Sequence, residues 1–116
     1  MSFRLVDDMK TITDEPILRA ITARLSEAYR PDRIYLFGSK ARGDDGPDSD
    51  WDVLVVVPDD ASGERRRGRL GYEALWGMDT AVDVVVMARR AFDARRRLKA
   101  SLPGTVLREG RLLYAV

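Results

Sequence analysis

An unbroken apolar run, Val-Leu-Val-Val-Val at residues 53–57, constrains the fold of this chain more than any other feature. Its length suits a strand, and Pro58 and Asp59 end it. Because the run does not alternate with polar residues, both of its faces should be covered, which predicts a central strand over residues 52–57. Residues 81–87, apolar except for Asp83, have a similar pattern and predict a second central strand.

Further elements follow from periodicity and from turn residues. Residues 15–29 repeat apolar side chains at helical spacing, with Thr13 or Asp14 as N-caps and Pro16 in the first turn. Residues 34–37 predict a strand that ends at Gly38, and Ser39 is expected to cap a short helix beginning at Lys40. The remaining expectations are a weak strand or arm over 1–10, a glycine-interrupted helix over 61–78, a basic helix over 89–100, a turn or helix after 104, and a last strand over 111–116.

This order predicts an α/β (α+β) fold: a single domain over residues 1–116, with a mixed four- or five-stranded sheet packed with helices. The chain has 116 residues, of which 45% are apolar, enough for one packed core. No apolar segment approaches the roughly 20 residues that cross a bilayer, so no membrane association is expected.

The residue types that are absent exclude whole classes of chemistry. The chain contains no cysteine, which rules out disulfides and thiolate metal sites and fits a cytoplasmic location. It contains no histidine, so imidazole catalysis and histidine-bound zinc are excluded. Any bound metal must therefore have oxygen ligands, which favours magnesium, manganese or calcium. The 20 basic and 19 acidic residues nearly cancel, and so the overall charge does not indicate a nucleic-acid-binding protein.

Three aspartates form the candidate metal site. Asp50 and Asp52 are two residues apart, and on a strand such a pair shares one face while Trp51 points to the other. If the strand carrying Asp83 lies beside this one, the third carboxylate can join them. Three carboxylates repel one another, but two divalent cations would reverse the balance of charge. Taken singly, the Asp-x-Asp pair resembles a solvated turn and Asp83 an exposed strand start.

A small-residue turn precedes the aspartates. Gly38 lets the backbone turn sharply and lets a ligand approach it, and Ser39 adds a hydroxyl and the free amides of a helix start, which attract phosphate. Arg42 has two interpretations that the sequence does not separate: a salt bridge to Asp44 or Asp48, or a direct contact with phosphate.

Together, Gly38-Ser39-x-Ala-Arg42-Gly43, then Ser49-Asp50-x-Asp52, then Asp83 between β-branched residues resemble the nucleotidyltransferase superfamily of DNA polymerase β. Within it, the chain is similar to the minimal nucleotidyltransferases of prokaryotes. The resemblance implies that Asp50, Asp52 and Asp83 are catalytic and hold two Mg²⁺ ions, or Mn²⁺ in their place. It implies that Gly38 and Ser39 hold the β- and γ-phosphates of a nucleoside triphosphate, with Arg42 ordering the turn or touching phosphate. Val53, where many members have Leu or Ile, is a minor departure.

The resemblance also implies a partner. Minimal members often act as the antitoxin of a toxin–antitoxin module beside a HEPN-domain toxin, and some adenylylate that toxin. The leading hypothesis is therefore transfer of AMP from ATP to a hydroxyl on a partner protein. The alternatives are a catalytically silent antitoxin that acts by binding and an RNA-end nucleotidyltransferase. The sequence leaves the base, the acceptor and the oligomeric state open, including a homo-oligomer.

Two arginine-rich runs and several aromatic residues remain. The runs are Arg65–Arg67 with Arg69, and Arg95–Arg97 with Lys99. A solvated surface balanced by nearby acids is the favoured interpretation; the alternatives are steering of the triphosphate or docking on an acidic or RNA-bound partner. Direct RNA binding is the weaker choice, because only Phe92 lies near the second run. Core packing is expected for the remaining aromatic candidates, and no base-recognition residue is assigned: Tyr35, Phe37, Trp51, Tyr72 and Trp76.

Overall fold

The computed structural model describes residues 15–116, and these form a mixed four-stranded sheet with helices on both faces. The strands are β1 (Arg33–Phe37), β2 (Trp51–Val57), β3 (Val82–Ala88) and β4 (Arg111–Ala115), in the order β3-β2-β1-β4. β2 and β3 are parallel, whereas β1 is antiparallel to both β2 and β4. The predicted α+β fold with a mixed sheet is confirmed in its four-stranded form. The expectations for residues 1–10 and for Thr13 and Asp14 lie outside the described residues.

The two apolar strands occupy different places in the sheet. β2 is an inner strand, and the five valine and leucine residues of its run are fully buried, as predicted. Among the strands of residues 15–116, β3 lies at the edge of the sheet, so the prediction of a second central strand was wrong. Helices pack on both faces of β3, and this packing accounts for its apolar residues. A strand at the edge of a sheet can be covered in this way without a second neighbouring strand. Val84 is buried while most of β3 is only partly covered.

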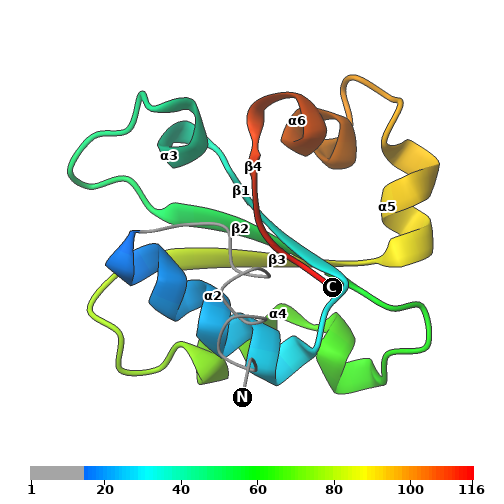
Figure 1. Ribbon diagram of the computed structural model, residues 1–116, viewed down its shortest axis with the longest axis horizontal. Helices are drawn as coiled ribbons and strands as arrows, with labels where there is room; N and C mark the ends of the chain where they lie inside the picture. Colours follow the sequence, from blue (N-terminus) through cyan, green and yellow to red (C-terminus); the bar gives the residue numbers. More distant parts are fainter. Residues whose placement is uncertain (1–14) are drawn as a thin grey trace, which may run out of the picture.

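Helices cover the sheet in two layers (Figure 1). α2 (Pro16–Tyr29) and α4 (Gly68–Ala74) lie on one face, and α5 (Arg89–Arg95) and α6 (Leu102–Glu109) lie on the other. The short helix α3 (Ser39–Arg42) follows β1, at the opposite end of the molecule from α5. None of the helices between residues 15 and 116 is long and apolar enough to cross a bilayer.

The alternation of side chains along β2 divides the core into two parts. Trp51, Val53, Val55 and Val57 pack with the helix residues of the α2 layer. Leu54 and Val56 pack on the other face, with Phe92 of α5 and Val106 of α6. Because neighbouring side chains on a strand point to opposite faces, Asp52 lies on the face of Leu54, as the spacing predicts.

Several helix boundaries differ from expectation. The segment predicted as one interrupted helix divides into a 3₁₀ turn, η1 (Gly63–Arg66), and α4, separated by an extended Arg67. The basic helix ends at Arg95, before the predicted limit, and α6 begins at Leu102 after Ser101, whose hydroxyl accepts a hydrogen bond from the Gly104 amide at 3.1 Å. Glu15 takes the N-cap position of α2, with Pro16 in its first turn as expected.

The glycines of α4 let it pack closely on the sheet. A Cβ at Gly71 would lie 3.0 Å from Val84 Cγ1 and 3.1 Å from the Tyr29 hydroxyl oxygen. That hydroxyl is buried, accepts a 2.7 Å hydrogen bond from the Gly71 amide and donates to the carbonyl of Arg67. The glycines, which would weaken an isolated helix, therefore set the short distance between α4 and β3.

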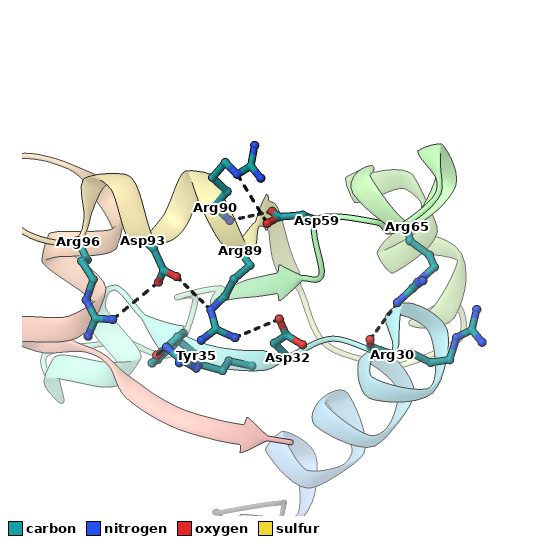
Figure 2. Close-up of polar contacts among 10 residues, drawn as sticks. Arg30, Asp32, Tyr35, Asp59, Arg65, Arg89, Arg90, Asp93 and Arg96 are labelled. Carbon is teal, nitrogen blue, oxygen red and sulfur yellow. Dashed lines mark hydrogen bonds and ion pairs between the residues drawn. The ribbon is translucent and has the colours of Figure 1, made fainter.

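Many of the arginines have partners within the fold (Figure 2). Arg65 donates to the carbonyls of Tyr29 (2.8 Å) and Arg30 (3.0 Å) at the end of α2, where helix carbonyls lack intrahelical donors. On the other side of the sheet Arg89 bridges Asp32 and Asp93 at 3.3 and 3.2 Å. Within the two basic runs, Arg69 pairs with Glu73 at 3.6 Å and Arg96 pairs with Asp93 at 3.7 Å, as expected for residues balanced by nearby acids, whereas Arg65 bonds to backbone carbonyls.

Candidate active site

The candidate site begins where β1 ends. Phe37 pairs with Asp52 across the sheet, so Gly38 leaves β1 directly beside the Asp52 side chain. Gly38 has φ 76° and ψ −161°, a conformation that essentially only glycine adopts. A Cβ at this position would lie 2.2 Å from Asp52 Oδ2. Both the backbone conformation and the neighbouring carboxylate therefore require glycine here.

The turn after Gly38 forms the short helix α3. The carbonyl of Gly38 accepts hydrogen bonds from the amides of Ala41 and Arg42, both at 3.1 Å. Gly38 is thus the N-cap, and the Ser39 side chain makes no capping hydrogen bond, so the prediction that Ser39 caps the helix was wrong. The cause is that the glycine conformation starts the helix one residue earlier. Ser39 opens α3, where the first amides of a helix lack intrahelical acceptors.

Two of the three aspartates, Asp52 and Asp83, come together at the adjoining ends of β2 and β3. Asp52 and Asp83 are direct partners in the parallel register. Both lie on the sheet face opposite Trp51 and Val84, which pack in the α2 layer. Asp50 immediately precedes β2 rather than lying within it. Asp52 is partly buried, whereas Asp50 and Asp83 are exposed.

The three carboxylates influence one another electrostatically. Burial raises the pKa of Asp52, and repulsion from Asp83 and then from Asp50 raises it further. Arg42 acts in the opposite direction and lowers the pKa of Asp52. A cation placed here would relieve this repulsion, which is the physical basis of a metal site.

The donor set suits a hard cation. In residues 15–116 no three acidic side chains are placed so that they could hold one ion together. The two neighbours Asp52 and Asp83 nevertheless offer adjacent carboxylates, and the exposed side chains of Asp50 and Asp83 can reach other rotamers. Carboxylate oxygens are the ligands that magnesium and manganese prefer.

The two basic residues of α3 differ in their surroundings: Arg42 acts electrostatically on Asp52, whereas Lys40 contacts Trp51, on the opposite face of β2. Arg42 is ion-paired with Asp44 at 3.1 Å and with Glu109 at 3.7 Å, which matches the salt-bridge alternative for Arg42 with Asp44 and not Asp48 as its partner. Its contact with phosphate stays a prediction. Lys40 lies 4.3 Å above the Trp51 ring and 3.3 Å from Asp45 Oδ2.

A hollow of about 630 Å³ opens beside Asp83. The Tyr72 hydroxyl oxygen lies 3.5 Å from Asp83 Oδ1. Trp76 is 85% exposed and Tyr72 is 54% exposed, so the expectation that these two rings pack in the core was wrong, whereas it is confirmed for Tyr35 and Trp51. The spacing of four residues between the two exposed rings was the signal available in the sequence. The hollow is lined mainly by Asp50, Tyr72, Leu75, Trp76, Met78 and Asp83.

Comparison with known proteins identifies the family of this domain. Residues 18–111 match the family described as nucleotidyltransferase domain. The chain belongs to the nucleotidyltransferase domain family. No curated protein matches it.

Three solved structures have folds similar to that of this chain. A chain in the crystal structure of a toxin–antitoxin with AMP-PNP is 26% identical, with a TM-score of 0.56 over 83% of this chain and 72% of that one. A putative nucleotidyltransferase from Sulfolobus solfataricus is 24% identical, with a TM-score of 0.50 over 67% and 70%. A mutant of the toxin–antitoxin MntA-HpeT is 23% identical, with a TM-score of 0.54 over 82% and 71%. The last two likenesses support the fold alone.

Proposed function

We propose that this nucleotidyltransferase domain transfers a nucleoside monophosphate, AMP from ATP, to a hydroxyl group on a partner protein. The observation that carries the proposal is the pairing of Asp52 with Asp83 on one sheet face, directly beside the Gly38 turn. The similarity to a chain of a toxin–antitoxin crystallised with AMP-PNP supports ATP as the nucleotide and a toxin as the partner. The resemblance to minimal nucleotidyltransferases implies that this toxin has a HEPN domain.

The residues divide the reaction between them. Gly38 and Ser39 hold the β- and γ-phosphates against the start of α3. The acceptor oxygen attacks the α-phosphorus; a new phosphorus–oxygen bond forms, and the bond from the α-phosphorus to the oxygen bridging the β-phosphorus breaks. Pyrophosphate leaves with that oxygen, and Asp83 receives the proton of the acceptor hydroxyl. Positioning of the reactants in line supplies much of the rate.

Magnesium fits this donor set. Asp50, Asp52 and Asp83 would hold two Mg²⁺ ions, which when bound supply positive charge to the phosphate oxygens. Bound magnesium would stabilise the ionised form of Asp52 in particular, because burial and two acidic neighbours disfavour that form in its absence. Removal of magnesium with a chelator should therefore abolish transfer.

The test uses ATP labelled at the α-phosphate, magnesium and the purified protein encoded beside this chain. Label should appear on that protein. Asp50→Asn and Asp83→Asn should each reduce transfer by about 100-fold or more, because each removes charge stabilisation at the reacting phosphate. Both residues are exposed, so the fold should persist. Asp60→Asn is the matched control: Asp60 is an exposed aspartate in the loop after the far end of β2.

The outcomes separate this proposal from its alternatives. A silent antitoxin would leave no label on the partner protein. Its Asp50→Asn, Asp52→Asn variant would still bind and neutralise the partner. Label on an RNA end, with binding that weakens steeply as salt rises, indicates an RNA-end nucleotidyltransferase.

A further inference from the structure

The hollow beside Asp83 includes two of the proposed metal ligands, Asp50 and Asp83, in its lining but none of the residues of the Gly38 turn. Its other walls are α4, the loop that follows it and the start of β3. We infer that this hollow is the acceptor-docking site, that it takes a peptide segment of the partner protein, and that Trp76 is its main contact. The inference rests on the proposed function, because it names where the acceptor of that reaction binds.

The order of the strands supports this assignment. An in-line displacement needs the attacking and leaving oxygens on opposite sides of the phosphorus atom. Across the sheet, the Gly38 turn ends β1, Asp52 lies on β2, and Asp83 lies on β3, the edge strand against which the hollow opens. Neighbouring strands are about 4.8 Å apart, so the turn and the hollow are separated by roughly two strand spacings. Pyrophosphate held at the turn therefore leaves in one direction, and the acceptor approaches from the other.

The charge of the hollow selects the kind of acceptor. Asp50 and Asp83 lie at its rim, and the residues that line it in the described part of the chain include no lysine or arginine. A nucleic-acid end would bring phosphates against two carboxylates without the basic side chains that track a backbone. An uncharged hydroxyl on a protein side chain meets no such repulsion and can donate its proton to Asp83.

The lining favours a segment with an apolar residue beside the hydroxyl. Leu75 and Met78 line the hollow, and the two exposed rings of Tyr72 and Trp76 stand at its edge. Aromatic side chains that are exposed in the free protein and become buried on association are typical anchors of protein interfaces. α4 holds the Tyr72 ring in place, because the close approach of Gly71 to Val84 fixes the distance of α4 from β3. Trp76 lies in the turn after α4, where its carbonyl accepts a 3.0 Å hydrogen bond from Arg24 of α2.

The experiment measures acceptor and nucleotide separately. The probe is the purified protein encoded beside this chain, and the variant is Trp76→Ala, which removes an 85% exposed side chain and should not disturb folding. The acceptor KM, measured by label transfer at saturating ATP, and the partner Kd should both rise by about tenfold or more, as for an interface anchor. The Kd for magnesium-ATP, measured by calorimetry without the partner, should change less than about twofold, an effect well under 1.4 kcal/mol. Leu98→Ala is the control, because Leu98 is 59% exposed and does not line the hollow.

Three results would overturn the inference. A tenfold weaker affinity of Trp76→Ala for magnesium-ATP would place the nucleoside, not the acceptor, in the hollow. Unchanged affinities for both ligands would leave the hollow without a role. Label transfer to RNA that Trp76→Ala abolishes would make nucleic acid the occupant. The proposed function and the docking site can fail separately. If the wild-type chain transfers no label but Trp76→Ala weakens its binding to the partner, the proposed function is refuted and the docking site is supported.

Discussion

Substitution of Gly38 by alanine tests the construction of the site directly. The backbone conformation of Gly38 is one that non-glycine residues adopt at a cost of about 1–3 kcal/mol. The added Cβ would also lie 2.2 Å from Asp52 Oδ2, and overpacking of this kind typically costs about 1–3 kcal/mol more. Because Asp52 is only partly buried, its side chain can rotate away, so we expect a total near the lower end of the sum, about 3 kcal/mol.

Chemical denaturation measures this loss, and label transfer measures the catalytic effect. The displaced Asp52 carboxylate should reduce transfer by about 100-fold, as misplacement of a reacting group by an ångström can. Gly43→Ala is the matched control, because Gly43 has φ 84° but a Cβ added there would meet no heavy atom within 4 Å. It should lose only about 1–2 kcal/mol from the left-handed backbone and retain activity.

A double-substitution cycle isolates the contact from the backbone strain. In an Asp52→Ala background the carboxylate is absent, so Gly38→Ala should cost less there than in the wild-type chain. Equal losses of stability in the two backgrounds would refute the claim that Gly38 is required by its neighbour. Equal effects of Gly38→Ala and Gly43→Ala on label transfer would also refute this claim.

Two further predictions concern stability. The pKa of Asp52 is raised above its ordinary value of 3.8, so ionised Asp52 destabilises the folded state, and this penalty appears as the pH rises through the raised pKa. Asp52→Asn should therefore raise the melting temperature near neutral pH in a chelator, with a gain that vanishes below pH 3.8; a gain independent of pH contradicts the reasoning. Tyr29→Phe should lower the free energy of unfolding by about 1–3 kcal/mol, because the Gly71 amide loses its acceptor; an unchanged denaturation midpoint would count against that hydrogen bond.

Much of the fold could be predicted from local patterns. The apolar run of β2, the helical spacing of α2 and the glycine at the end of β1 each act within a few residues and placed their elements correctly. The neighbours of β3 could not be predicted, because apolar residues report cover by helices and not pairing with a second strand. The break at Arg67 also depends on tertiary packing, since the Arg67 carbonyl accepts a hydrogen bond from Tyr29 and α4 is positioned by Tyr29 and Val84.

The candidate site was predictable where the chemistry depends on spacing. Asp50, Asp52 and the turn at Gly38 follow from distances along the chain, whereas the register of Asp83 with Asp52 becomes visible only in the structure. The role of Ser39 as a cap was wrong, because a glycine in a special conformation starts α3 one residue earlier. The hollow at Tyr72 and Trp76 was missed, since the exposure of a ring depends on how its helix packs.

The pairing of Asp52 with Asp83 has a consequence for how the chain reaches its native form. Side chains alternate along a strand, so a slip of one residue between β2 and β3 would move Asp83 to the sheet face where Val84 is buried and set a valine beside Asp52. A ligand that needs both carboxylates binds only chains in which β2 and β3 have paired in the native register. Binding of such a ligand therefore shifts the equilibrium from chains with misaligned strands toward chains with correctly paired strands.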